Sequence, residues 1–388
     1  MYSLSNFAKM IRDQVRMQMY TEALRQAVKP GAVVIDIGAG TGIFALIACQ
    51  LGARKVYAID PNPLIRLGEQ MAAANGFADR IVFLQAYSTQ LELPEQADVI
   101  VGDLRGQLPF LYPNIAAYHD ARARFLKPDG VLIPQRDQLY AALVSAPDSY
   151  AELIEQPWAQ NVYELDMQAA LPLTVNMPVS ALKLSAEQMI LPGQMWEELV
   201  YGVRTEAGGS GVLTWDVDTP GRAHFIALWF EAELIDGVGF SGHPLVELRP
   251  EVYGSSYLPL QEPLDLAPGQ VVRLALNADP VGQGYIYRWK TSLYANPADA
   301  KADQPLKQFA QSTFFANPVS DLRKRITSYK PRLNRKGAIQ LYVFSRMQSG
   351  DQSLEAISKA IQHEFPDVYD TEADALAYVA NLAEKFSE

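Results

Sequence analysis

The stretch Val33–Gly42, Val-Val-Ile-Asp-Ile-Gly-Ala-Gly-Thr-Gly, limits the possible folds of this chain more than any other. Its first five residues are apolar except for Asp36, which is typical of a strand buried on both faces. The glycines at alternate positions, Gly38, Gly40 and Gly42, then predict a tight turn, and the apolar residues after them predict a helix. Glycines at such a turn let backbone N–H groups approach a ligand closely. The stretch therefore predicts a site for a nucleotide-like ligand.

The glycine spacing narrows the choice of ligand. A dinucleotide-binding turn has glycine at its first, third and sixth positions, but the sixth position here is Ile43. A second predicted strand, residues 55–59, ends at Asp60, whose carboxylate is suited to accept both hydroxyls of a ribose. Since the turn also has no phosphate-binding lysine, these features favour S-adenosylmethionine, with a turn that holds no cofactor as the alternative. The predicted cofactor-binding residues of this region are Asp36, Gly38, Gly40, Gly42 and Asp60.

Length and composition set the broad class. With 388 residues the chain is long for one core, so two domains and a smaller third are expected. The formal net charge of -11 argues against non-specific binding to nucleic acid. No run approaches the roughly 20 apolar residues of a membrane span, and the N-terminus has no signal pattern, so we expect a cytoplasmic protein without a membrane partner. The single cysteine, Cys49, excludes an internal disulfide and a cysteine-rich zinc site, and no residue spacing suggests any other metal site.

Apolar residues at helical spacing over residues 7–28 predict one or two helices before the glycine turn. They carry Arg16, a basic residue on the approach to the site, for which a solvated surface charge is the alternative. After Asp60, helices and strands alternate as far as Ile133, with a helix expected at residues 114–125, which predicts a parallel sheet with right-handed crossovers.

Ligands of such sheets lie at the carboxyl ends of the strands. The loop of residues 85–89 is therefore expected to meet the adenine, with Ser88 and Thr89 within reach. The loop of residues 102–106 is expected to meet the methyl acceptor.

The pattern changes around Pro134. Strand-like segments separated by Gly- and Pro-containing turns follow, and they predict an antiparallel sandwich or barrel of about 150 residues. These segments are residues 139–144, 198–204, 224–234, 271–277 and 285–293. The predicted domains are N-terminal capping helices (1–30), a Rossmann-like α/β domain (31–138), an antiparallel β-barrel domain (139–300), and a linker with a small helical module (301–388). Residues 296–305, rich in Pro, Ala and Asp, are the linker candidate.

Together these segments resemble the protein arginine methyltransferase family over roughly residues 10–293. The resemblance rests on Met10–Arg16 with Tyr20, the glycine motif, Gly52–Val56, Phe125–Gly130, Ile133–Pro134 and Asn161–Met167. Because Asn161–Met167 lies beyond the generic methyltransferase core, the resemblance is specific. It implies an N-terminal helix over a Rossmann-like domain, S-adenosylmethionine between them, a β-barrel and a homodimer.

The resemblance also implies roles for single residues. Arg16 would pair with the methionine carboxylate, and Asp60 would hold the ribose. The family clamps a guanidinium between two glutamates in the loop after the fourth strand, but here those positions hold Asp103 and Tyr112. The family's Thr-His-Trp segment is replaced near Glu251-Val252-Tyr253.

One acid remains in the loop, with Arg105 two residues further on, so the loop is close to neutral and less suited to a guanidinium. We take Asp103, Arg105 and Tyr112 as the candidate catalytic residues. In one chemistry Asp103 orients and deprotonates an amine, hydroxyl or guanidine, with help from Glu231 or Glu233. In another, Arg105 holds a carboxylate acceptor, which needs no base. An internal ion pair of Asp103 and Arg105 that only shapes the loop is the third interpretation.

We therefore expect an S-adenosylmethionine-dependent methyltransferase that acts on a nitrogen or oxygen of a peptide, protein or small molecule and leaves S-adenosylhomocysteine. The alternatives are a true peptide or protein arginine N-methyltransferase with a remodelled acid pair, and an inactive cofactor-binding scaffold. The tail loosely resembles the peptide-binding winged-helix modules of enzymes that modify ribosomal peptides, and a plain helical cap has the same pattern.

Overall fold

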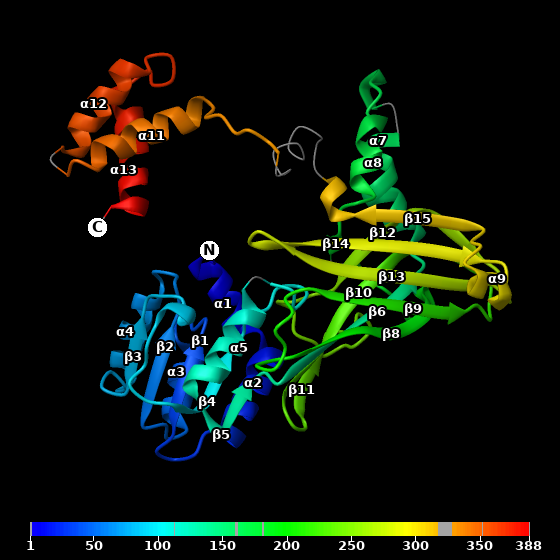
Figure 1. Cartoon of the computed structure of the whole chain (residues 1–388), viewed down its shortest axis with the longest axis horizontal. Helices are drawn as coiled ribbons and strands as arrows, with labels where there is room; N and C mark the ends of the chain where they lie inside the picture. Colours follow the sequence, from blue (N-terminus) through cyan, green and yellow to red (C-terminus); the bar gives the residue numbers. More distant parts are fainter. Residues whose placement is uncertain are drawn as a thin grey trace. The chain divides into compact units, whose positions relative to one another are not determined.

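A computed structural model describes residues 2–111, 113–159, 162–180, 182–316, 328–350 and 352–387. The chain divides into two compact units, Met1–Pro318 and Val319–Glu388, which we describe separately (Figure 1).

The first unit begins with a parallel five-stranded sheet of strand order β3-β2-β1-β4-β5, as the alternation of strands and helices predicts. Its strands are β1 (Val33–Ile37), β2 (Lys55–Ile59), β3 (Ile81–Leu84), β4 (Ala97–Gly102) and β5 (Leu126–Ile133). Its helices are α3 (Ile43–Gln50), α4 (Ile65–Ala74), the short η1 (Ser88–Gln90) and α5 (Asn114–Phe125). All five residues of the central strand β1 are buried, so its carboxyl end delivers the glycine turn to the middle of the sheet edge.

Two helices precede this sheet, α1 (Leu4–Arg12) and α2 (Gln14–Ala27). Asp13 separates them because its extended backbone ends α1 and its side chain accepts a hydrogen bond from the Arg16 N–H, which caps α2. The buried face of α2 carries Arg16 and Tyr20, and this face brings both side chains to the sheet.

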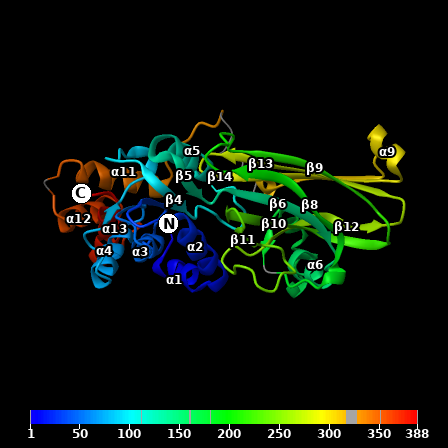
Figure 2. The same cartoon turned by 90° about the horizontal axis from the view of Figure 1, so that it is seen from below.

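The antiparallel strands predicted after Pro134 are present, and they form two sheets. The first has the order β7 (Val179–Ser180), β12 (Ser256–Leu266), β10 (Gly221–Ile235), β6 (Arg136–Val144) and β8 (Met189–Val200), with β11 (Val238–Ser241) paired to β10. The second has the order β15 (Lys307–Ser312), β14 (Gly284–Tyr294), β13 (Val271–Val281) and β9 (Gly209–Asp216). In Figures 1 and 2 the parallel and antiparallel parts lie at opposite ends of the unit, and α2 contacts β11 where they meet.

Short helical segments connect β6 to β8. They are α6 (Pro147–Tyr150), η2 (Ala151–Glu155), α7 (Gln156–Ala159), η3 (Val162–Glu164), η4 (Gln168–Ala170), α8 (Leu171–Thr174) and η5 (Ala186–Gln188).

The linker predicted at residues 296–305 is wrong. Residues Pro297–Ala302 form helix α9, in which Asn296 caps the amides of Ala298 and Asp299 and proline occupies the first turn, where it needs no hydrogen-bonded N–H. Strand β15 then pairs with β14, so the antiparallel part continues past the predicted boundary at residue 300 and is followed by η6 (Thr313–Ala316).

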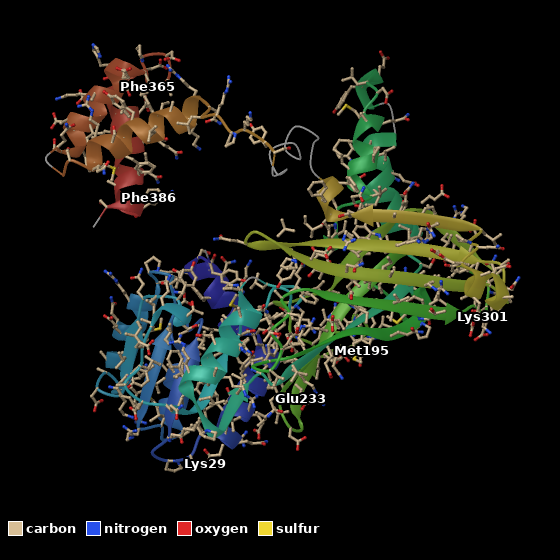
Figure 3. The ribbon with its side chains drawn as sticks, viewed as in Figure 1. Lys29, Met195, Glu233, Lys301, Phe365 and Phe386 are labelled. Atoms are coloured by element: carbon tan, nitrogen blue, oxygen red, sulfur yellow. The ribbon has the colours of Figure 1, made fainter. Side chains whose placement is uncertain are left out.

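The second unit is helical, with α11 (Arg335–Met347), α12 (Leu354–Glu364) and α13 (Glu372–Phe386) around a core that includes Val343, Ile361 and Val379. Figure 3 labels Phe365 after α12 and Phe386 at the end of α13. Within residues 328–350 and 352–387 there is no strand, so the described part of the tail lacks the wing of a winged helix. Across the described residues, no helix has the length and apolar character that a membrane crossing requires.

Candidate functional site

The glycine turn packs too tightly for side chains. Gly38, Gly40 and Gly42 have φ of 72°, 56° and 83°, in the left-handed region that favours glycine. A Cβ at Gly40 would lie 2.3 Å from Cε1 of Phe7, and a Cβ at Gly38 would lie 2.5 Å from Cδ2 of Leu104. The glycines therefore allow α1 and the loop after β4 to close over the turn.

A cavity of about 640 Å³, counted with its opening to solvent, lies beside this turn. Its wall includes Arg16 from α2, Gly38 and Thr41 from the turn, Asp60 after β2 and Asp103 after β4. The structure thus brings together residues from four segments at the carboxyl ends of the parallel strands, as predicted for this sheet.

Asp60 is fixed at the turn by two main-chain hydrogen bonds. Its Oδ2 accepts from the Gly40 N–H at 2.8 Å and its Oδ1 from the Asn62 N–H at 2.7 Å. Burial raises the pKa of Asp60 despite these two bonds. Each oxygen keeps a second lone pair, so the carboxylate can still accept ligand hydroxyls.

Asp36 lies behind the turn rather than on the cavity wall. It is fully buried, and its Oδ2 accepts from the Ala45 N–H at the start of α3. Burial raises the pKa of Asp36 to about 7, and its Oδ1 has no partner among the described residues. The geometry gives Asp36 a part in holding the turn, and its contact with a cofactor stays a prediction.

Ser88 and Thr89 lie in η1, away from the residues that line this cavity. Ser88 is buried and its carbonyl accepts a hydrogen bond from Arg124, whereas Thr89 is exposed. Their predicted contact with the adenine stays a prediction.

Arg16 forms a hydrogen bond with the loop of residues 102–106 after β4, which we call the acceptor loop. Its Nε donates to Oδ2 of Asp103 at 2.7 Å and its Nη1 to the Met10 carbonyl at 3.1 Å, while the guanidinium lies over the rings of Tyr20 and Phe44. Burial alone would lower the pKa of Arg16, but the negative charge of Asp103 outweighs burial and raises this pKa above its ordinary value. The guanidinium therefore stays charged. Its Nη2 has no hydrogen-bond partner in the described part of the chain and remains available to an anionic ligand.

Asp103 is held by three side chains. Besides Arg16, the Tyr253 hydroxyl donates to its Oδ2 at 2.6 Å, and Arg105 Nη1 lies 3.3 Å from its Oδ1. Burial would raise the pKa of Asp103, but the two guanidinium groups and the tyrosine outweigh it and hold that pKa below its ordinary value. Asp103 is therefore a fixed carboxylate.

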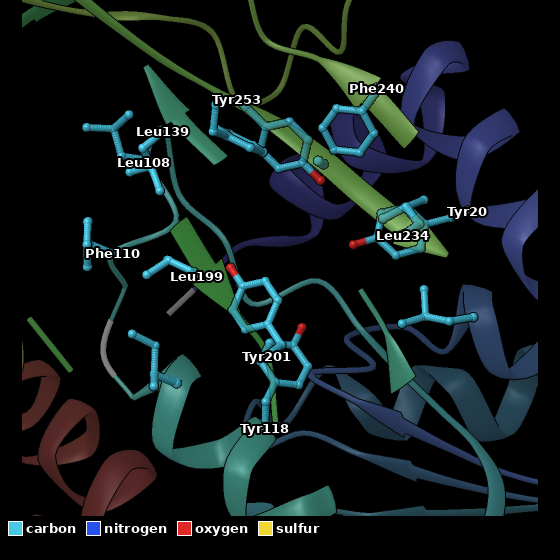
Figure 4. Close-up of a cluster of buried hydrophobic side chains, with 14 of the residues drawn as sticks. Tyr20, Leu108, Phe110, Tyr118, Leu139, Leu199, Tyr201, Leu234, Phe240 and Tyr253 are labelled. Carbon is cyan, nitrogen blue, oxygen red and sulfur yellow. The ribbon is translucent and has the colours of Figure 1, made fainter. Parts of the chain in front are cut away.

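Arg105 forms a buried bidentate pair with Asp137 in β6. The Nε–Oδ2 and Nη2–Oδ1 distances are 2.7 and 2.8 Å, and the two side chains are 1% and 0% exposed. The Tyr20 hydroxyl accepts from Arg105 Nη1 at 2.5 Å, and the Tyr201 hydroxyl donates to Asp137 at 2.6 Å. Figure 4 shows Tyr20, Tyr201 and Tyr253 in one buried cluster.

This pairing bears on two of the sequence interpretations. Because Asp137 already occupies the fork of Arg105, the geometry argues against Arg105 as the anchor of an acceptor carboxylate and favours an internal ion pair. Glu231 and Glu233 do not assist Asp103, since they line a different hollow beside Arg136, which pairs with Glu233. Tyr112 lies outside the described residues, and its role stays a prediction.

A second cavity, here called the acceptor cavity, lies against the same loop. Its wall includes Lys9, Gln107, Glu251 and Tyr253, and it shares Tyr2, Met10, Asp103 and Arg105 with the first. The two cavities are therefore neighbours, and Asp103 is one of the four residues that line both.

Sequence reasoning missed Asp137, Tyr20 and Tyr201 as parts of this network. In the sequence, Asp137 is a single polar residue near the start of a strand. No local pattern links it to Arg105, which lies 32 positions earlier.

Comparison with solved structures gives the same architecture. A protein arginine methyltransferase 1 enzyme–prozyme complex from Trypanosoma brucei matches with a TM-score of 0.68 and 20% identity, covering 79% of this chain and 96% of that one. Protein arginine methyltransferase 10 from Arabidopsis thaliana matches with a TM-score of 0.67 and 18% identity, covering 80% and 97%.

Sequence comparison finds similarity to methyltransferases. The family model of ribosomal protein L11 methyltransferase matches residues 17–160. Probable protein arginine N-methyltransferase 6 of Arabidopsis thaliana is 30% identical over 237 residues, 58% of this chain and 53% of that protein. The chain is protein arginine methyltransferase-like.

The match of this arginine methyltransferase-like chain to its curated relatives is partial. Protein arginine N-methyltransferase 10 of Oryza sativa subsp. japonica is 30% identical over 198 residues, 49% of this chain and 52% of that protein. The chain thus spans about half the length of these relatives.

Proposed function

We propose that this chain is an S-adenosylmethionine-dependent methyltransferase that methylates a nitrogen or oxygen of a peptide, protein or metabolite. The observation that carries the proposal is that two neighbouring cavities share Asp103 in their walls, one beside the glycine turn and Asp60, the other lined by Tyr253. A methyl transfer needs its two reactants held close together and in line, with water excluded, and adjoining cavities suit that need.

The residues of the first cavity fit the cofactor. Asp60 can accept ribose hydroxyls, and Arg16 Nη2 can donate to the methionine carboxylate. When bound, S-adenosylmethionine supplies an electrophilic methyl group on a sulfonium. Two similar solved structures, the Trypanosoma brucei complex and a protein arginine methyltransferase 6, were solved with AdoHcy and SAH, which supports the same ligand class here.

A true arginine N-methyltransferase is the second candidate, because the curated relatives carry that name. The acceptor loop is poorly suited to a guanidinium substrate, because Arg16 and Arg105 already neutralise the charge of Asp103.

The test incubates the full chain with methyl-labelled S-adenosylmethionine and a fractionated lysate, then treats the labelled material with mild base. We expect label that is stable to base. Release as methanol would identify a methyl ester instead. Cofactor binding by calorimetry without transfer to any fraction would identify an inactive scaffold and overturn the proposal.

We propose further that the protein is a cytoplasmic homodimer whose antiparallel part closes as a barrel. In support, Tyr163, Leu165 and Met167 on the segment between β6 and β8 are 90%, 59% and 43% exposed, as an interface arm would be. The single cysteine suits a reducing compartment. Sedimentation of the full chain, with Tyr163→Ser as the variant that should shift it to monomer, tests the dimer.

A further inference from the structure

We propose that the methyl acceptor is an amine, presented as one uncharged nitrogen, and not a guanidinium, carboxylate or hydroxyl. This inference rests on the proposed methyltransferase function. It follows from the position of Asp103 on the wall of both cavities, in contact with Arg16, Arg105 and Tyr253.

The first step counts the hydrogen-bonding positions left on the acids around the site. Asp13 and Asp137 line neither cavity, and Asp60 lines only the cavity beside the glycine turn, so none of the three faces the acceptor cavity. Oδ2 of Asp103 carries two short bonds, from Arg16 and Tyr253.

Oδ1 of Asp103, unlike Oδ2, still has an open hydrogen-bonding position. Among the described residues it has one contact, 3.3 Å from Arg105 Nη1, and Asp103 borders both cavities. One open oxygen can anchor one N–H, whereas a guanidinium binds a carboxylate best through two parallel bonds. The site therefore offers single-point anchoring.

The positive charges around Asp103 favour some acceptor groups over others. Two buried guanidinium groups, Arg16 and Arg105, face Asp103, and the cofactor's sulfonium would add a third positive charge. Nearby positive charges disfavour the protonated form of an amine. The site thus favours the neutral amine, which is the nucleophilic form.

A carboxylate acceptor lacks an anchor. The Nε–Nη2 edge of Arg105 is taken by Asp137, and its Nη1 bonds Tyr20 and Asp103. The other cation among the described lining residues of the acceptor cavity, Lys9, is solvent-exposed, where water screens its charge. A hydroxyl acceptor lacks a base, because the pKa of Asp103 is held low by the same two arginines.

An amine needs no base for the bond-forming step. With S-adenosylmethionine bound, the nitrogen lone pair would form the bond to the methyl carbon as the carbon–sulfur bond breaks, with its electron pair left on sulfur as a thioether. The positive charge would then be on nitrogen, and the methylated ammonium would lose its proton to water in the acceptor cavity. Asp103 orients the amine through Oδ1 throughout.

Glu251 is the other carboxylate of the acceptor cavity and the one candidate for a second acid among its described lining residues. It is exposed, so it would add little to the binding of a guanidinium. The variant Glu251→Gln therefore should not change the type of methylated product.

The experiment labels two acceptor sources, a fractionated lysate and a pool of random ten-residue peptides with free amino termini. Acid hydrolysates are separated against standards of N-methyl-lysine, N-methyl amino acids and the methylarginines, and small amines are analysed directly. Label in methylated amines supports the inference. Label in methylarginine, a base-labile ester or an ether overturns it, and no label in any fraction overturns the methyltransferase function itself.

Two variants distinguish an effect on the positioning of the acceptor from an effect on folding. Tyr253→Phe removes the hydroxyl that donates to Oδ2 of Asp103. The Asp103 carboxylate then has an open hydrogen-bonding position on each oxygen and can bind a guanidinium through two bonds. The ratio of methylarginine to methylated amine in the products should therefore rise at least about tenfold. Tyr150→Phe is the matched control, because its buried hydroxyl bonds the Leu260 carbonyl in the antiparallel part. An unchanged product ratio in Tyr253→Phe, with folding retained, contradicts the single-point anchor.

Discussion

The Nε atom of Arg16 lies 2.7 Å from Oδ2 of Asp103, although the two residues are 87 positions apart in the chain. Their side chains are 5% and 7% exposed, so water screens the pair little. Arg16 lines the cavity beside the glycine turn, and Asp103 lines both cavities. The ion pair therefore links the walls of the two cavities.

Arg16→Lys should weaken binding of S-adenosylhomocysteine about tenfold, because an ammonium cannot bond Asp103 and a ligand carboxylate with a planar fork. Isothermal titration calorimetry measures it. Arg54→Lys, at an exposed pair with Glu95 in the same domain, is the control and should bind normally. Unchanged affinity in Arg16→Lys would remove Arg16 from the cofactor site.

Gly40→Val should reduce cofactor affinity by at least about 100-fold. Its left-handed backbone costs a side chain about 1–2 kcal/mol, and the new Cβ would displace Phe7 from the turn. Gly76→Val shares the positive φ but has no atoms within 4 Å of the added Cβ, so it should keep its affinity. Equal losses in both variants would mean that the effect is general destabilisation.

Asp103→Asn should slow methyl transfer about 100-fold, the effect of losing the orientation of a reactant. Cofactor affinity should change less than about threefold, because Arg16 Nη2 stays in place. Single-turnover transfer and calorimetry give the two numbers. A normal transfer rate would exclude Asp103 from the reaction.

Asp137→Ala should lower the free energy of unfolding by about 3–5 kcal/mol, since it leaves the Arg105 guanidinium buried without its partner. The double variant Arg105→Met with Asp137→Leu should recover much of this loss, because neither charge remains. Urea unfolding followed by tryptophan fluorescence measures both. Strictly additive losses would contradict the coupling.

Asp36→Asn should change the pH dependence of stability. The folded protein holds the Asp36 proton up to about pH 7, whereas the unfolded chain releases it near a pKa of about 3.9. The stability from this group is therefore complete below about pH 3.9 and is lost as the pH rises through about 7. Unfolding of both proteins at about pH 5 and about pH 8 should show the variant gaining on the wild type at the higher pH. The same difference at both pH values would refute the shift.

Much of the fold could be predicted from the sequence. Strand 55–59 and helix 114–125 were predicted with their observed bounds, because apolar periodicity is strong in a two-sided parallel sheet. Helix α9 was read as a linker, because Pro297 and the small polar residues around it suit a loop as well as a capped helix. The strand predicted at residues 198–204 overlaps β8 only as far as Val200, since the register of antiparallel strands depends on partners far along the chain.

The sequence by itself determined the glycine turn and the carboxylate after β2, because these lie in short continuous motifs. Only the tertiary structure decided what Arg105 does. Its partner Asp137 comes from β6, and its other neighbours Tyr20 and Tyr201 come from α2 and the end of β8. Ion pairs form between side chains that the fold brings within a few ångströms, and their spacing along the chain carries no trace of that proximity.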